Sequence, residues 1–430
     1  MGTMDDICDK LPSSKMLEES AKQEVPSDAG NSAQTAVMGS PSEEEVRLLA
    51  LRLVVSGDLA LESKGNDHVV VVNDASASRT RLSLAAFRFL RMFESPRRIG
   101  EALPIQSLAG ILPTVRVFID RHILVDADAP KVESVPKLRV ATAYKFCSAP
   151  AYVKPIVPHF VILGAPYDLS EDIESRLVPD LIRRKSLDYS YLLGFNDGRP
   201  RGWFDANRSL WILRGATIAD AGDVRIDFGE NQARFLGRMA DALDECCVGQ
   251  TVPVVLGGDR LVTRAAVGWL CSRQTLTVVQ ITCEQEPSAG EGAGLEMLRF
   301  AGVERVVRLG MLHGIRNHSR RVNLWECSAA TVRDLGPERV ANTWGENAAV
   351  YLSVNMSVTA RDCMKSAGNS PSDRLTFHEI GALIAAIGNI HRIVGLDLVG
   401  LDMASELSAL KATLGCQLAL AGMSAAYDRF

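Results

Sequence analysis

Residues 252–286, VPVVLGGDRLVTRAAVGWLCSRQTLTVVQITCEQE, decide the fold class of this chain. Residues 252–256 and 276–281 are almost entirely apolar and have the length of buried strands. Residues 261–270, between them, are expected to form a helix. Short buried strands joined through a helix are typical of a parallel sheet that is covered on both faces. Ligands of such sheets bind beyond the carboxyl ends of the strands, so we expect functional residues directly after each strand.

The residues at these two strand ends resemble motifs of the arginase/agmatinase ureohydrolases. In that family one strand ends in Gly-Gly-Asp-His and the next in Asp-Ala-His-x-Asp, and their His and Asp residues bind two manganese ions. This chain has Gly-Gly-Asp-Arg at 257–260 and Thr-Cys-Glu-Gln-Glu at 282–286. The resemblance therefore implies a ureohydrolase scaffold with a changed set of ligands.

The resemblance continues in the same order over residues 158–425. Residues 164–168, 178–183 and 221–224 are similar to the family's Gly-x-Pro-x-Asp, Gly-Pro-x-x-Ile-Arg and Leu-Gly-Asp-Val steps. Further strands and helices are expected at 230–248, 349–358, 377–387, 390–402 and 405–421. The implied fold class is α/β, a three-layer α/β/α parallel sheet of the ureohydrolase type.

Seven positions align with the family's six metal ligands and with the Glu that binds the substrate guanidinium: Arg260, Thr282, Glu284, Glu286, Asn355, Ser357 and Gly400. None keeps the family's residue. Ureohydrolysis needs two cations that share an attacking water, whereas Arg260 brings a fixed positive charge. We therefore predict that the dinuclear manganese centre is lost and that no metal cofactor remains.

Three interpretations of this altered site stay open. In a pseudoenzyme, Arg260 pairs with Glu284 or Glu286, since a buried charge needs a partner. In a repurposed catalytic site, Cys283 acts as a nucleophile with His313 and Glu284, although a small buried Cys is more often a packing residue. In a single-metal site, Glu284, Glu286 and His313 bind one ion.

The first third of the chain is organised differently. Residues 1–43 contain few large apolar side chains and are expected to form a disordered tail. In the domain 44–128 we expect strands at 52–55, 59–62, 68–73 and 79–82, helices at 84–93, 99–103 and 108–121 and a closing strand at 122–125, with Ser83 as a helix N-cap. A proline-containing linker, 129–157, leads to the ureohydrolase-like domain 158–430.

This order of elements is winged-helix-like (α+β) and resembles the PqqD-like peptide-recognition domain of enzymes that modify ribosomally made peptides. Such domains bind a leader peptide as an added strand beside a helix. The peptide-binding candidates are Val69, Val71, Arg79, Arg81, Leu84, Phe87 and Arg88. A packing or dimerisation module is the alternative. DNA binding is disfavoured, because the helix 108–121 carries only Arg116 and Arg121 as basic residues.

Composition narrows the function classes further. The 430 residues carry a formal net charge of −5 and no long basic run, so no nucleic-acid partner is expected. No apolar run has the length of a membrane span. Nine cysteines without a CxxC pair favour free thiols and a cytoplasmic location.

We therefore expect a catalytically degenerate ureohydrolase-like protein of natural product biosynthesis. It would bind a ribosomal precursor peptide through residues 44–128 and present it to a modifying enzyme. Two alternatives are an active or repurposed hydrolase or transferase acting on a peptidyl arginine guanidinium, and a structural subunit of a hetero-oligomer with an intact homologue. Ureohydrolases commonly form trimers and hexamers, so a homo- or hetero-oligomer is expected.

Overall fold

The structure is a computed structural model of the chain. It describes residues 43–64, 67–73, 78–102, 108–129, 138–167, 176–206, 208–226, 232–283, 296–311, 323–356, 374–401, 403 and 408–429. The chain forms two compact units, residues 1–135 with 226–230, and residues 136–225 with 231–430. Most of the expected tail, residues 1–42, lies outside the described residues.

A nine-stranded sheet is the centre of the larger unit. Its strands are β7 (Arg139–Val140), β8 (Phe160–Ala165), β12 (Ile218–Val224), β13 (Val252–Gly257), β14 (Leu276–Ile281), β15 (Val303–Met311), β16 (Leu324–Ser328), β17 (Ala349–Asn355) and β18 (Arg392–Val399). Their order is β16-β15-β14-β17-β18-β13-β8-β12-β7. All neighbours are parallel except β7, which pairs antiparallel with β12, so the expectation of a parallel sheet holds for eight of the nine strands.

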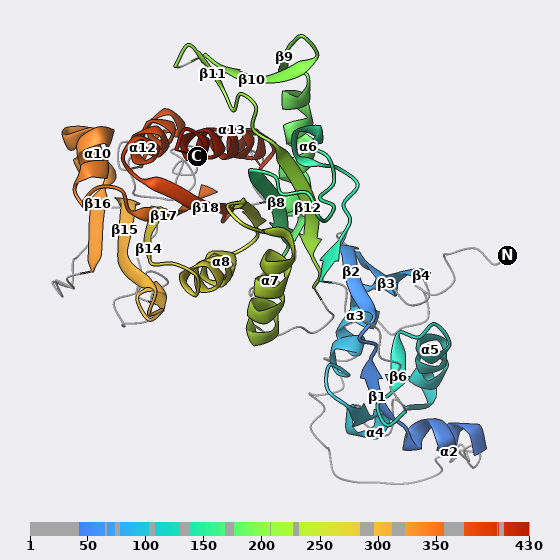
Figure 1. The fold of residues 1–430 in the computed structure, drawn as a ribbon. Coiled ribbons are helices and arrows are strands. Elements are labelled where there is room, and N and C mark those ends of the chain that lie inside the picture. The colour runs from blue at the N-terminus through green and yellow to red at the C-terminus, as the bar shows by residue number, and fades with distance from the viewer. Residues whose placement is uncertain are drawn as a thin grey trace, which may run out of the picture. The chain divides into compact units, whose positions relative to one another are not determined.

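Helices cover both faces of this sheet, as the three-layer expectation requires. They are α6 (Val178–Ser190), α7 (Gln232–Cys246), α8 (Leu261–Cys271), α10 (Ala329–Leu335), α11 (Pro337–Asn342), α12 (Phe377–Ile390) and α13 (Ser408–Tyr427). Figure 1 shows α12 and α13 on one side of the sheet and α7 and α8 on the other. Every residue of β8, β13 and β14 is buried, which explains why these strands are apolar runs in the sequence.

Two parts of the larger unit differ from expectation. Residues 138–157, expected to lie in a linker, are built into the unit through β7 and a short 3-10 helix, η3 (Phe146–Ser148). The Phe146 N–H donates to Asp220 Oδ2 at 2.8 Å, which attaches this stretch to β12. An unexpected antiparallel meander, β9 (Gly194–Asn196), β10 (Arg199–Asp205) and β11 (Leu210–Ile212), lies between α6 and β12 in the sequence.

The smaller unit follows the expected order of elements closely. It contains α2 (Glu43–Ala50), β1 (Arg52–Val55), β2 (Leu59–Lys64), β3 (His68–Asn73), β4 (Ser78–Ser83), α3 (Leu84–Arg91), β5 (Arg97–Arg98), α4 (Ile99–Ala102), α5 (Leu108–Asp120) and β6 (Leu124–Asp126). Two three-stranded sheets form, β2-β3-β4 and β5-β1-β6. Ser83 caps α3 as expected, since its side chain accepts a hydrogen bond from Ala86 N at 3.1 Å.

Across the part of the chain that the structure describes, no helix is both long enough and apolar enough to cross a membrane.

Candidate functional site

The sheet order brings four strand ends together. β14, β17, β18 and β13 are consecutive and parallel, so their carboxyl ends lie side by side. Asn355 ends β17, Thr282 and Gly400 directly follow β14 and β18, and Arg260 lies three residues after the end of β13. Residues more than a hundred positions apart thus meet at one edge, as expected for a ligand site of a parallel sheet.

A small cavity of about 20 Å³ lies at this edge. Its lining combines two guanidinium groups with hydroxyl and amide side chains: Arg260, Thr263, Gln280, Ile281, Thr282, Arg308, Ser353, Asn355 and Val399. A cavity of this size holds about one water molecule.

Arg260 and Gly400 differ in how they border this edge. Arg260 is the N-cap residue of α8, and its side chain is exposed to solvent while it lines the cavity. Gly400 has φ +69°, and a Cβ there would lie 2.3 Å from Asn355 Oδ1. Its N–H donates to Gly258 O at 2.9 Å, which connects the end of β18 to the Gly-Gly turn after β13. A glutamate at position 400 would therefore require Asn355 to move.

A row of buried polar residues crosses the sheet at the cavity, and three of its four members line it. Arg308, Gln280, Ser353 and Asp397 are register partners on β15, β14, β17 and β18. They are 4%, 9%, 4% and 0% exposed, in strands that are otherwise mostly apolar. The sequence analysis missed this row. Each of these residues interrupts an apolar run of the sequence, and this could have marked them. Only the strand register shows that the four interruptions lie side by side.

Asp397 is the most unusual member of the row. Tyr351 Oη donates to its Oδ2 at 2.8 Å, and the Thr263 and Ser353 hydroxyls, 3.1 Å apart, lie beside it. Burial raises the pKa of Asp397 to about 6, and hydrogen bonds from Ser353, Tyr351 and Thr263 oppose that rise. The carboxyl group therefore titrates within the pH range of ordinary experiments.

The described residues do not fit a dinuclear manganese centre. Manganese prefers carboxylate and imidazole ligands, whereas Arg260, Thr282 and Asn355 supply a guanidinium, a hydroxyl and an amide. Among the residues whose placement is described, no three His, Cys, Asp or Glu side chains could together hold a metal ion. The other candidates lie outside the described residues: Glu284, Glu286, His313 and Ser357.

Cys283, the candidate nucleophile, is 3% exposed and packs in the hydrophobic core of the larger unit. Cys283 therefore lies where a small apolar side chain would lie, in agreement with the alternative interpretation of this cysteine as a packing residue.

The peptide-binding candidates of the smaller unit fall into two groups. Val69 and Val71 lie on β3, the central strand, and are fully buried in the core of the unit. The others border β4, the last strand of its sheet, and the helix that follows it. Arg79, Arg81 and Arg88 are exposed, whereas Leu84 and Phe87 are half-buried.

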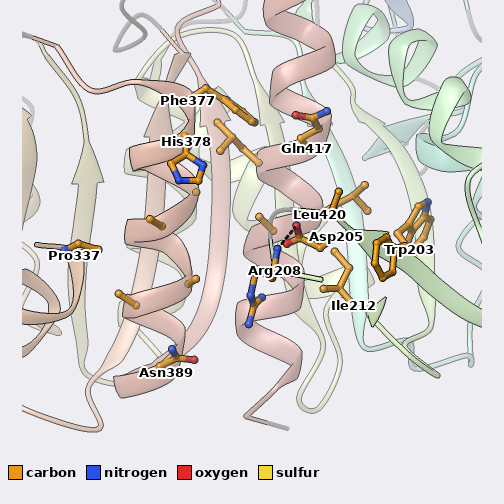
Figure 2. A pocket seen from close by; sticks show the side chains of 18 of the residues that line it. Trp203, Asp205, Arg208, Ile212, Pro337, Phe377, His378, Asn389, Gln417 and Leu420 are labelled. Carbon is orange, nitrogen blue, oxygen red and sulfur yellow. Dashed lines mark hydrogen bonds between the residues drawn. The ribbon is translucent and has the colours of Figure 1, made fainter. Parts of the chain in front are cut away.

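A second, larger depression lies between α12, α13 and the meander of the larger unit. It has a volume of about 740 Å³, within the range of small-molecule sites. Small residues of α12 (Gly381, Ala382, Ala385) lie along one wall. Figure 2 shows Phe377 and Asn389 near the two ends of that wall, with Trp203 and Ile212 of the meander across from it. None of the site residues expected from the sequence lies in this depression.

Comparison with solved structures defines the class of fold. The proclavaminate amidino hydrolase of Streptomyces clavuligerus is 19% identical, with a TM-score of 0.50, over 66% of this chain and 98% of that chain. A hypothetical agmatinase from Burkholderia thailandensis is 16% identical, with a TM-score of 0.55, over 67% and 92%. The formimidoylglutamase of Bacillus subtilis subsp. subtilis str. 168 is 15% identical, with a TM-score of 0.50, over 72% and 98%. The larger unit therefore has a ureohydrolase-type α/β fold.

The arginase family model matches residues 158–424. The chain belongs to the arginase family. No curated protein sequence matches it.

Proposed function

We propose that this arginase-family protein binds a ribosomal precursor peptide through its smaller unit and presents it to a modifying enzyme. We also propose that its arginase-like unit no longer carries out metal-dependent hydrolysis. The edge strand β4 supports the proposal of peptide binding. The side chains at the carboxyl ends of the central strands, which are poor manganese ligands, support the proposal that hydrolysis is lost.

The edge of β4 is suited to an added strand. Among the described residues β4 pairs only with β3, so the main-chain groups of its other edge can hydrogen bond a peptide. Thr80 and Leu82 point into the core, while Arg79 and Arg81 alternate with them on the exposed side. An extended peptide at this edge would meet arginine side chains at every second residue, which favours acidic peptides.

The helix beside this edge supplies apolar contacts. α3 starts directly after β4, and its Leu84 and Phe87 are half-buried. Side chains that are only partly covered in the free protein can gain burial when a peptide docks, at roughly 25 cal/mol per Å² of apolar surface. Main-chain pairing would thus set the affinity, and these side chains would set the register.

The test is a titration of the full-length protein with a fluorescently labelled precursor peptide encoded beside it. We expect saturable binding, and about tenfold weaker binding for Phe87→Ala and for the double change Arg79→Glu with Arg81→Glu, because each removes roughly 1.4 kcal/mol of contact. The double change Arg116→Glu with Arg121→Glu, at two exposed arginines in and after α5, is the control matched in charge. Absence of saturable binding at micromolar concentration, or equal weakening by the control, would refute peptide capture.

Loss of metal-dependent hydrolysis is tested separately. The purified protein should contain far fewer than two manganese ions per chain after incubation with excess manganese and desalting, because Arg260, Thr282 and Asn355 replace three ligand positions. Release of urea from arginine or agmatine should not exceed the rate without protein. Two tightly bound ions per chain would restore the case for a hydrolase, whatever the peptide titration shows.

A further inference from the structure

We infer that the adjacent thiols of Cys246 and Cys247 form a two-sulfur site that binds a trivalent arsenical, such as an arsenous or organoarsonous acid. α7 ends at Cys246 and β13 begins at Val252, so the pair lies near the amino end of β13. The cavity described above lies at the carboxyl ends of the strands. The inference goes beyond the proposed function and does not depend on peptide binding by the smaller unit.

The two sulfur atoms are placed to share one bound atom. Their Sγ atoms are 3.8 Å apart, and one thiol donates a hydrogen bond to the other. Two sulfurs held by one tetrahedral ion at about 2.3 Å would also be about 3.8 Å apart. A disulfide needs sulfurs about 2.05 Å apart and usually joins Cα atoms about 4.4–6.8 Å apart, whereas consecutive Cα atoms are only about 3.8 Å apart. The pair therefore suits chelation better than a direct bond between the sulfurs.

The end of α7 gives access to the pair. Cys246 is buried in the core, whereas Cys247 is half-buried and the next residue, Val248, is 48% exposed. The N–H of Cys247 donates to Leu243 O at 2.8 Å, which fixes Cys247 at the end of the helix. A reagent from solvent can thus reach Cys247 first, and the sulfur of Cys246 then closes the chelate.

The neighbouring carboxylates do not complete a site for a metal ion. Glu245 Oε1 pairs with Arg139 Nη2 at 3.0 Å. Asp244 pairs with Arg273 and also accepts a hydrogen bond from the Trp269 ring N–H at 2.9 Å. Within the described ranges no three His, Cys, Asp or Glu side chains could hold a metal ion together. Zinc takes about four ligands, whereas a trivalent arsenical needs only two sulfurs because its third substituent stays its own.

The protonation state of the thiols also favours an arsenical over a metal cation. A hydrogen bond with Cys246, together with burial, raises the pKa of the Cys247 thiol well above its ordinary value. A metal cation binds thiolates and must displace both protons. An organoarsonous acid reacts with neutral thiols: two As–S bonds form, two As–O bonds break, and each thiol proton leaves with a hydroxide as water. Arsenic stays trivalent, so the step needs no oxidant.

The test uses the full-length, reduced protein and phenylarsine oxide, which is phenylarsonous acid in water. Intact-mass spectrometry should show one adduct per chain at equimolar reagent, with the mass of the acid minus two water molecules. The dithiol 2,3-dimercaptopropanol should remove the adduct. 2-Mercaptoethanol at the same thiol concentration should not, because a single thiol cannot replace a chelate.

Two variants locate the site. Cys246→Ala keeps a small apolar side chain in the core, and Cys247→Ser changes a half-buried one; thermal unfolding checks that both fold. Each should bind the arsenical at least about 100-fold more weakly, because a second attachment adds about 10²–10⁴ to the first. Cys271→Ser is the matched control. Cys271 is a half-buried cysteine of α8 whose thiol donates to Gly268 O at 3.3 Å, so binding should be unchanged.

Three results would overturn the inference. The first is unchanged binding by Cys247→Ser, the variant that alters the core least. The second is an adduct that the monothiol removes as readily as the dithiol. The third is a zinc ion that the purified wild-type protein retains through dialysis and that both variants lose, which would make the pair part of a metal site.

Discussion

At the scale of single residues, Arg183 connects two sequence motifs that are far apart. Its guanidinium is fully buried, with Nε 2.8 Å from Asp220 Oδ2 and Nη1 2.6 Å from Asp223 Oδ1. Its Nη2 also donates to Gly222 O at 2.9 Å. The Ile-Arg and Gly-Asp-Val steps of the sequence are therefore two halves of one buried ion cluster, which attaches α6 to β12.

Arg183→Met should destabilise the larger unit by about 3–5 kcal/mol, because it leaves Asp220 and Asp223 without their cation. The free energy of unfolding, measured by urea denaturation, gives the value. Arg184→Met is the matched control: Arg184 is 58% exposed beside Asp180, and its loss should cost less than about 1 kcal/mol. A similar cost for both variants would contradict the role assigned to the cluster.

Asp397 should make stability depend on pH. Its folded pKa, about 6, is above the ordinary aspartate pKa of 3.8, so the folded state binds more protons than the unfolded state between these values. Its contribution to stability is then complete below pH 4 and is lost as pH rises to about 6, by roughly 3 kcal/mol. The difference in unfolding free energy between the wild type and Asp397→Asn, measured from pH 4 to 7, should show this fall. A flat difference would contradict it.

At the scale of elements, the start of α12 depends on a capping box. Thr376 Oγ1 accepts from Glu379 N, and the Glu379 carboxylate accepts from Thr376 N. Glu379 also pairs with Arg333 of α10 at 2.6 Å, so the cap connects two helices of one layer. Ser or Thr with Glu three residues later is a known start signal of a helix.

Thr376→Ala should cost about 1 kcal/mol of unfolding free energy, because the first turn of α12 loses its side-chain acceptor. Thr413→Ala is the control: the Thr413 hydroxyl donates to Ala409 O one turn back within α13, so this change should cost little. Chemical denaturation of both variants gives the comparison, and equal costs would show that the cap is unimportant.

At the scale of the whole molecule, the described residues of each unit bury apolar side chains within that unit. Leu90 belongs to a cluster within the smaller unit and Ile384 to a cluster within the larger unit. Each unit buries its own apolar surface, so each can unfold as its own cooperative transition. Such a chain need not have a single unfolding temperature.

Calorimetry of the full-length protein should therefore resolve two transitions. Leu90→Ala and Ile384→Ala remove side chains that are 0% and 1% exposed, and each should destabilise its own unit by about 2–5 kcal/mol. Leu90→Ala should shift only the transition of the smaller unit, and Ile384→Ala only the other. A single transition that both variants shift equally would contradict independent unfolding.

The ureohydrolase-type α/β class and the position of nearly every central element could be predicted from the amino-acid sequence. Apolar runs such as β13 and β14 coincide with buried strands because burial on both faces leaves a strand no polar positions. The N-cap of α3 could also be predicted from the sequence, because a cap depends on neighbouring residues alone. The sequence did not predict the β9–β11 meander, nor the part of the expected linker that joins the sheet. Short antiparallel strands leave little periodicity in the sequence.

Which polar residues lie together depends on the three-dimensional arrangement of the strands. Strand order places Thr282, Asn355, Gly400 and Arg260 at one edge, which the sequence anticipated through a family resemblance. The row from Arg308 to Asp397, three members of which line the cavity, depends on the register of four strands. Register is set by packing between segments distant in sequence, and a shift of one residue would turn each side chain to the opposite face of the sheet.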